Sequence, residues 1–441
     1  MAVLRSLRSR TLGLFAALTV LLPLPALAVT VEKVVSPGGI VAWLVQDHSN
    51  PIISLEVTFR GGAALDPAAK SGLAAMAAGL LDEGAGPYDS QAFQGKLEDL
   101  VITLGFDAGR DGLRGHLKTL SENRDTAFDL FRLAVTQPRF DKEPVERIRG
   151  QILSGLMREA QDPNSQASRA WFEAMFPGHP YARSAHGSVE TVRTIQVGDL
   201  RAFAKSHLAL DRLVVGVVGD ITPDELARRL DATFGALPAK SPLPPVPDVA
   251  ARAGGGLRVI DKDNPQTTAI FGLPGIGRRD PDWYAAYVMN YILGGGGFSS
   301  RLTEEVREKR GLAYSVYSYL VPMEHSGLMI GGVATENGRF AESIRLIREE
   351  FRRMRDEGPS EQELTDAKTY LNGSFPLQLD STAGIAGLLL QIQIDDLGID
   401  FLDRRNALIS AVTLDAVRQA ARRLLDPDAL TIVAVGRPAG M

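Results

Sequence analysis

The chain repeats its own landmarks, and this repetition constrains the fold more than any other feature of the sequence. An Asn-Pro pair occurs at residues 50–51 and again at 264–265, and an Asp-Pro pair occurs at 66–67 and again at 280–281. Both offsets are 214 residues. Each Asn-Pro precedes an apolar run typical of a buried strand, and each Asp-Pro precedes a run with helical periodicity. Equal offsets at several landmarks indicate two homologous units in tandem.

The boundaries of the two units follow from the segment that joins them. Each unit ends in an apolar strand closed by glycine, at Leu213–Gly219 and at Leu430–Gly436. Between the units, residues 238–256 contain several prolines followed by a run of glycines. This composition cannot hold a helix and is typical of a semi-extended linker. We therefore expect a first domain over residues 29–237 and a second over residues 257–441.

Within each unit, strand-like runs alternate with long amphipathic helices. Thr222 and Glu225 form one predicted capping box with a proline at the first helical position, and Ser360 and Glu363 form another. The pattern predicts a sheet with helices packed against it. The expected fold class is α+β, repeated twice.

The N-terminus has the pattern of a targeting segment. Three arginines lie within the first ten residues, a short apolar run spans residues 12–24, and Ala26-Leu27-Ala28 forms a small-residue cleavage pattern. These features predict a cleaved secretory signal over residues 1–28. A membrane anchor is the alternative, but the run is shorter than the roughly 20 apolar residues that a spanning helix needs. We expect an exported protein, periplasmic in a Gram-negative bacterium, with no membrane attachment after cleavage.

The composition excludes further kinds of site and partner. The chain has no cysteine, which excludes disulfides and thiolate metal sites. Its net charge is -5, so no basic excess predicts a nucleic-acid partner. No two of its histidines have the spacing of a helical metal site, and we expect surface or structural roles for all six. They are His48, His116, His179, His186, His207 and His325.

The helix-like run after the first Asp-Pro is the most informative segment. Its apolar residues have helical spacing and predict a buried stripe, formed by Leu73, Met76, Ala77, Leu80 and Leu81. The opposite face consists almost entirely of small residues, namely Gly72, Ala75, Ala78 and Gly79, followed by Asp82. From these residues alone we expect a packed helix that another element approaches closely.

Several motifs resemble those of a known family. They are Gly72–Ala74, Phe176–Tyr181, Val218–Asp220, Gly294–Gly297 with Ser300–Leu302, and Arg307–Tyr314. The mature chain resembles the pitrilysin/insulinase family of zinc metallopeptidases, in particular its two-domain branch of the mitochondrial-processing type. The resemblance implies two tandem domains, each a mixed, largely antiparallel sheet with helices packed on one face, which together form half of a clam-shell.

The resemblance also implies that the metal site is absent. In active members a His-x-x-Glu-His motif follows Gly-Leu-Ala, and its two histidines bind zinc while the glutamate activates water. The matching positions here are Ala75, Ala78 and Gly79, and the family's third ligand, a glutamate, falls on Gly155. None of these residues can bind a metal or accept a proton. We expect no catalytic residue, no metal and no cofactor in this chain, and zinc in a partner subunit.

Two other residues match functional positions of the family. Arg307 lies near the end of a predicted helix that Gly311 terminates, and Tyr314 lies at the start of a predicted strand over residues 312–320. This order places two donors near one point. In the family, an Arg and a Tyr at this spacing bind the substrate backbone and help stabilise the tetrahedral intermediate. A surface arginine and a packed tyrosine are the alternative from the sequence alone.

The glycine run at residues 294–297 is not a phosphate-binding loop, because no Gly-Lys-Ser/Thr follows it. We interpret it as a flexible connection that opens the next helix, and the resemblance suggests that it lines the substrate chamber.

The leading functional hypothesis is a non-catalytic, substrate-binding subunit of a secreted heterodimeric zinc metallopeptidase. Its partners would be a homologous subunit that carries His-x-x-Glu-His and a peptide substrate. The chain would supply Arg307 and Tyr314 to the partner's zinc site. The alternative is a stand-alone peptide-binding or scaffold protein without a peptidase role. An active enzyme with an unrelated site is a third possibility, although no nucleophile–base arrangement supports it.

Overall fold

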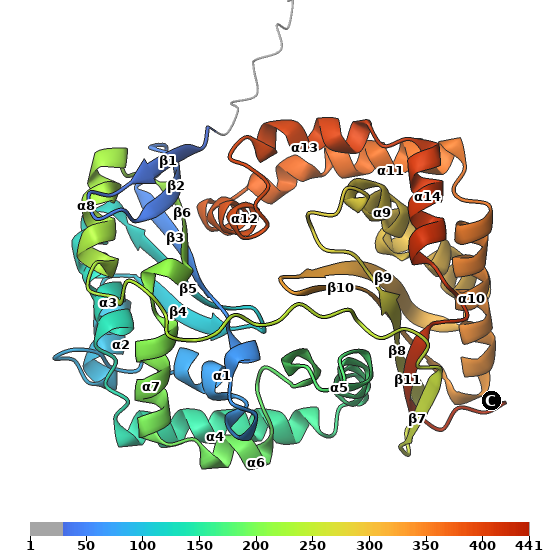
Figure 1. Cartoon of the computed structure of the whole chain (residues 1–441), viewed down its shortest axis with the longest axis horizontal. Coiled ribbons are helices and arrows are strands. Elements are labelled where there is room, and N and C mark those ends of the chain that lie inside the picture. Colours follow the sequence, from blue (N-terminus) through green and yellow to red (C-terminus); the bar gives the residue numbers. More distant parts are fainter. Residues whose placement is uncertain (1–29, 441) are drawn as a thin grey trace, which may run out of the picture.

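The computed structural model describes residues 30–440, so the predicted signal segment lies outside the described residues. Two sheets with their helices lie side by side around a central space (Figure 1). Residues 30–237 form the first half and residues 257–440 the second. The connecting residues 238–256 contain no helix or strand and cross between the halves along one side of the molecule (Figure 1).

The two sheets share the topology of five strands, and the first sheet has an additional strand at one edge. The first has the order β1-β2-β6-β3-β5-β4 and the second the order β7-β11-β8-β10-β9. The strands of the first are β1 (Glu32–Val35), β2 (Val41–Gln46), β3 (Ile52–Arg60), β4 (Thr103–Ala108), β5 (Gly112–Leu120) and β6 (Leu213–Gly219). Those of the second are β7 (Leu257–Asp261), β8 (Gln266–Pro274), β9 (Ala313–Met323), β10 (Ser326–Glu336) and β11 (Thr431–Gly436).

Strand polarity matches as well as strand order. In each sheet one pair is parallel, β2 with β6 and β7 with β11, and the other pairs are antiparallel. Strands β3 and β8 begin 214 residues apart, as do β5 and β10. The predicted α+β fold with two mixed, largely antiparallel sheets is confirmed.

Helices pack around each sheet, most of them on its outer face (Figure 1). In the first half they are α1 (Leu73–Ala78), α2 (Ser90–Asp99), α3 (Arg124–Thr136), α4 (Lys142–Glu159), α5 (Pro163–Met175), α6 (Val189–Thr194), α7 (Val197–His207) and α8 (Pro223–Phe234). In the second half they are α9 (Trp283–Asn290), α10 (Phe340–Asp356), α11 (Glu361–Gly373), α12 (Thr382–Ile394), α13 (Phe401–Ser410) and α14 (Leu414–Leu424).

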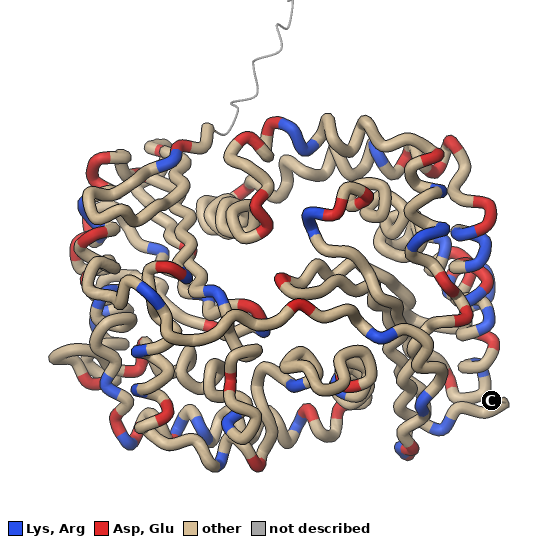
Figure 2. The backbone as a smooth tube through the Cα atoms, viewed as in Figure 1, with Lys and Arg blue, Asp and Glu red and all other residues tan. Residues whose placement is uncertain are grey.

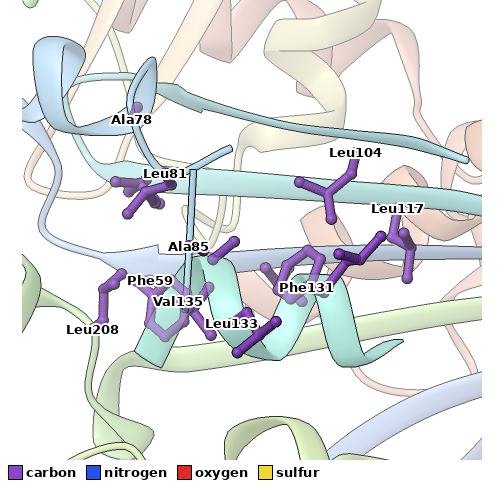
Figure 3. Close-up of a cluster of buried hydrophobic side chains, with 14 of the residues drawn as sticks. Phe59, Ala78, Leu81, Ala85, Leu104, Leu117, Phe131, Leu133, Val135 and Leu208 are labelled. Carbon is purple, nitrogen blue, oxygen red and sulfur yellow. The ribbon is translucent and has the colours of Figure 1, made fainter. Parts of the chain in front are cut away.

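The core of the first half forms between its sheet and α3. Phe131 of α3 packs against Phe106 of β4 with ring centroids 5.2 Å apart, and against Phe234 of α8 at 5.8 Å. Figure 3 shows Leu104 and Leu117 of the sheet in the same cluster. The alternation of buried and exposed residues along β5 reflects this one-sided packing.

The inner face of each sheet is covered by a helix from the other half. Helix α5 of the first half packs on β8 and β11, and α12 of the second half packs on β3 and β6. Figure 1 shows both helices reaching towards the opposite sheet. Glycines permit the close approach, because a Cβ on Gly272 would lie 2.7 Å from the indole of Trp171 and one on Gly216 would lie 2.7 Å from the carbonyl oxygen of Ala386. The two halves therefore complete each other's cores.

The β9–β10 turn forms a second connection between the halves. Arg60 pairs with Glu324 at 2.6 Å, and the Glu324 amide donates to Asp111 at 3.1 Å. The Tyr181 hydroxyl donates to Asp111 and accepts from the amide of His325 at 3.1 Å. Burial raises the pKa of Tyr181, so the phenol stays protonated and can continue to donate.

The connecting segment is held to both halves. The amide of Val249 donates to the His325 carbonyl at 2.9 Å, and the amide of Arg252 donates to the Met175 carbonyl at 2.8 Å. The Nδ1 atom of His325 also pairs with Asp248 at 3.0 Å. The segment is therefore an integral part of the packed molecule rather than a free tether.

None of the helices within residues 30–440 combines the length and apolar character needed to cross a bilayer.

We predict that Trp171→Ala destabilises the whole chain rather than one half. Trp171 is fully buried, and its indole N–H donates to the Thr431 carbonyl of the second sheet at 3.0 Å. Loss of this side chain should lower the free energy of unfolding by about 3–5 kcal/mol, measured by urea denaturation. Trp171→Phe keeps most of the packing and should cost less. Separate unfolding transitions of the two halves in the wild-type chain would contradict the expectation of one cooperative unit.

Candidate functional site

Helix α1 is held at its start by the Asp66 carboxylate. The backbone amides of Gly72 and Ala74 donate to Asp66 at 2.9 and 3.1 Å, and Gly72 has a positive φ of 94° that glycine tolerates readily. Asp66 is 3% exposed, and burial raises its pKa to about 7. The Asp-Pro landmark of the first half thus fixes where the helix begins.

The predicted stripe on this helix was wrong in its extent. Helix α1 ends at Ala78 with Gly79 as its C-terminal cap, so Leu80 and Leu81 lie beyond it, although both are buried. The face of small residues is closely approached by other elements, as expected, since Ala78 is 1% exposed. The packing of α1 against β4, α4 and α7 leaves little room for larger side chains there.

The four positions that match the zinc site lie on two elements that pack together. Ala75 and Gly79 are partly exposed on α1, and a Cβ on Gly79 would lie 3.5 Å from Cγ2 of Ile148 on α4. Gly155 lies two turns further along α4 on the same side as Ile148. Neither α1 nor α4 presents a metal-binding group at Ala75, Ala78, Gly79 or Gly155. Within residues 30–440 no cluster of three or more His, Asp or Glu side chains could hold a metal ion.

Three of the histidines pair with carboxylates that are not part of any metal-binding cluster. His48 pairs with Asp220 at 2.6 Å, His186 with Glu159 at 3.4 Å, and His325 with Asp248 at 3.0 Å.

The other three histidines make contacts within the first half or with the connecting segment. Nδ1 of His179 accepts from the Tyr181 amide at 3.2 Å and Nε2 contacts the Pro247 carbonyl at 3.0 Å, so this ring ties its loop to the connecting segment. His116 lies across Gly105, where a Cβ would be 2.7 Å from its ring. His207 is buried and stacks on Phe203 with ring centroids 3.8 Å apart.

Arg307 and Tyr314 lie together in the second half. The guanidinium carbon of Arg307 is 5.1 Å from the centroid of the Tyr314 ring. Arg307 belongs to a π-helical segment, Thr303–Glu308, and the following Gly311 has φ 58° and donates its amide to the Arg307 carbonyl at 2.7 Å. The predicted helix is present, but it is a π-helix through this segment, and Gly311 terminates it as expected.

A β-bulge turns Tyr314 outward. On β10, Ala334 pairs with Ser315 and Thr335 pairs with Ala313, so Tyr314 is the extra residue between them. Its side chain is 81% exposed. Strand β9 is an edge strand, so the bulge places the phenol at the border of the second sheet.

A cavity of about 420 Å³ adjoins the pair. Besides Arg307 and Tyr314 it is lined by Gln266, Glu308, Ala334 and Glu336, among others. Arg307 forms an ion pair through Nε with Glu308 at 3.3 Å. The cavity is open to solvent, and polar and apolar groups both contribute to its lining.

The glycine run differs from the flexible connection expected from its composition. Residues 291–295 form a π-helical turn and Gly297–Ser299 a 3-10 turn, so this is not a flexible connection. A Cβ on Gly294 would lie 2.3 Å from the Ser318 hydroxyl and 2.7 Å from its backbone nitrogen. Gly294 is required because it packs directly on β9, whereas nothing lies within 4 Å of a Cβ on Gly297, where the positive φ of 58° favours glycine.

Two further features could not be predicted from the sequence, because they depend on contacts between residues that are far apart along the chain. Arg301 is buried and binds both oxygens of Glu363, at 2.7 and 2.8 Å, which ties the segment before Arg307 to α11. A cavity of about 620 Å³ lies between the halves. It is lined by four arginines and five carboxylates, namely Arg60, Arg114, Arg278, Arg279, Asp111, Asp280, Glu324, Asp395 and Asp396. Figure 2 shows acidic and basic residues likewise interspersed elsewhere along the chain.

Comparison with known proteins identifies the family to which the chain belongs. Residues 194–371 match the family described as the peptidase M16 inactive domain. A Helicobacter pylori protein named "Non-peptidase homolog YmxG" is 30% identical over 335 residues, which cover 76% of this chain and 77% of that protein. The chain belongs to the peptidase M16 family. An uncharacterised zinc protease of Streptomyces coelicolor is 31% identical over 319 residues, 70% of this chain and 69% of the relative.

Solved structures agree with this membership. A peptidase M16 inactive domain from Pseudomonas fluorescens superposes with a TM-score of 0.87 at 30% identity, over 93% of this chain and 98% of that one. A protease from Helicobacter pylori has the same fold, with a TM-score of 0.84 at 18% identity over 92% of this chain and 99% of that one. The resemblance inferred from the motifs is confirmed, whereas the roles assigned to Arg307 and Tyr314 stay predictions.

We predict that His207 makes the chain less stable in mild acid. Burial lowers the pKa of His207 to about 4, below its value in the unfolded chain. Between these two values the unfolded state binds more protons, so stability is complete near neutral pH and is lost as the pH falls. The contribution should be about 2 kcal/mol smaller at pH 5 than at pH 7. Urea unfolding at both pH values should show a weaker pH dependence in His207→Phe, and an unchanged dependence would refute this role.

Proposed function

We propose that this chain is a non-catalytic, substrate-binding subunit that completes the zinc site of a homologous M16 subunit. The proposal rests on the contrast between the degenerate metal motif and the Arg307–Tyr314 pair in the same chain. The four positions of the metal motif hold only alanine and glycine, while the partly exposed Arg307 and the exposed Tyr314 lie together beside an open cavity. A guanidinium and a phenol suit a carbonyl oxygen that gains negative charge in a transition state.

The partner in this proposal carries His-x-x-Glu-His and binds the zinc. The substrate is a peptide in extended conformation, held partly through its backbone. The protein acts after export, in the periplasm, once residues 1–28 are removed. The match to an inactive M16 domain supports a role in which this chain contributes binding groups rather than the metal.

The second candidate is a stand-alone peptide-binding or scaffold protein. The packed interface between the halves and the charged cavity of about 620 Å³ are compatible with a self-contained binding protein. A chain that stays monomeric in the presence of the motif-bearing homologue, and binds peptides with Arg307 replaced, would favour this candidate.

The proposal predicts that Arg307→Ala lowers turnover without affecting assembly. Purified chain is mixed with the His-x-x-Glu-His homologue from the same genome, and cleavage of a quenched fluorescent peptide is followed. Wild-type chain should raise kcat/KM above that of the homologue alone. Arg307→Ala should remove roughly 10²-fold of kcat, since its hydrogen bond strengthens as charge develops. Tyr314→Phe should cost about tenfold for the same reason.

A matched control is Arg345→Ala, which removes an exposed arginine from α10. It should leave turnover unchanged, and size-exclusion chromatography should show the same complex for all variants. If the mixture is no more active than the homologue alone, the proposed function is wrong.

A further inference from the structure

Phe298 is exposed without an evident structural reason. Its side chain is 70% exposed and it belongs to none of the buried apolar clusters within residues 30–440. Burying an apolar ring against another group removes it from water and is favourable. Its one described aromatic contact is with the Arg307 guanidinium, whose carbon lies 4.7 Å from the centroid of the Phe298 ring.

Arg307 therefore has two aromatic neighbours. The Phe298 ring at 4.7 Å and the Tyr314 ring at 5.1 Å both lie within the range of cation–π attraction. Stacking uses the faces of the guanidinium plane, so the N–H groups at its edges stay available for an acceptor. The remaining contact of the group is the Nε ion pair with Glu308. Two rings thus attract the guanidinium without acting as hydrogen-bond acceptors for all of its N–H groups.

The segment that carries Phe298 is fixed to the segment that carries Arg307. Gly297 has φ 58°, and the amide and hydroxyl of Ser300 both donate to its carbonyl, at 3.1 and 2.8 Å. Ser300 is fully buried, and its hydroxyl contacts Thr303 at 3.1 Å. Thr303 is the first residue of the π-helical segment that contains Arg307. The position of Phe298 is therefore set by the same short stretch of chain.

The other end of the glycine run is equally constrained. A Cβ on Gly294 would collide with Ser318 of β9, and one on Gly295 would lie 2.9 Å from the amide of Asn290. Asn290 in turn bonds both the carbonyl and the hydroxyl of Ser318, at 3.1 and 2.9 Å. The glycine run is pinned to the strand that carries Tyr314, so both rings that face Arg307 are attached to one rigid frame.

We propose that Phe298 is a positioning residue that holds the Arg307 guanidinium in the plane in which it meets an acceptor. The positioning is a property of the isolated chain, while its consequence for turnover rests on the proposed function.

The first test needs no partner. Arg307 in the full-length mature chain is modified with phenylglyoxal, and its modification rate is followed by peptide mass spectrometry. Phe298→Leu removes the ring but keeps an apolar side chain, and the rate at Arg307 should rise roughly two- to fivefold as one stacking contact is lost. Phe298→Tyr restores a ring and should keep the wild-type rate. Leu377→Ala, which removes another exposed apolar side chain at 75% exposure, should leave the rate unchanged.

The second test uses the mixture with the His-x-x-Glu-His homologue and the quenched fluorescent peptide. Phe298→Leu should lower kcat roughly fivefold with little change in KM, and Phe298→Tyr should restore it. Equal phenylglyoxal rates in the wild type and Phe298→Leu would overturn the positioning proposal, whatever the activity. An altered rate with no stimulation of the homologue by wild-type chain would instead reject the proposed function and leave the positioning role intact.

Discussion

The exchange of one helix between the halves is the interaction on which the rest of the structure depends. Each sheet has its outer face covered by helices of its own half, but its inner face is completed by α5 or α12 from the other half. Two sheets with open apolar faces would not be stable separately in water. The duplication therefore produces one cooperative molecule, and it fixes the distance between the degenerate zinc positions of the first half and the Arg307 region of the second.

Local patterns predicted much of this fold. The 214-residue offset predicted the paired strands β3 and β8 because each follows the same turn and lies in the same place in its sheet. The exchange of α5 and α12 could not be predicted, since an amphipathic pattern shows that a helix has a buried face but not which sheet covers it. The same limit applied to the glycine run, which has the composition of a loop and whose packing on Ser318 arises from a contact between distant residues.

The candidate site also has features that the sequence predicted and features that it could not predict. Ala75, Ala78, Gly79 and Gly155 could be placed from motif spacing alone, because the family pattern fixes their order along the chain. The convergence of Arg307 and Tyr314 followed from a helix terminated by glycine before a strand. The bulge that turns Tyr314 outward could not be foreseen, because it depends on the register between β9 and β10. The sequence showed which chemical groups the site contains. The direction in which Tyr314 points, by contrast, depends on how β9 pairs with β10.

The close packing of α1 against β4, α4 and α7 has an evolutionary consequence. A return to metal binding would need two histidines and two glutamates, and zinc affinity would emerge only when most of them were present. Each earlier step would carry a cost, since a glutamate at the nearly inaccessible Ala78 would be a buried, unpaired charge. The packing around Ala78 therefore opposes a stepwise return to a metalloenzyme, because the glutamate needed there is costly before any metal is bound.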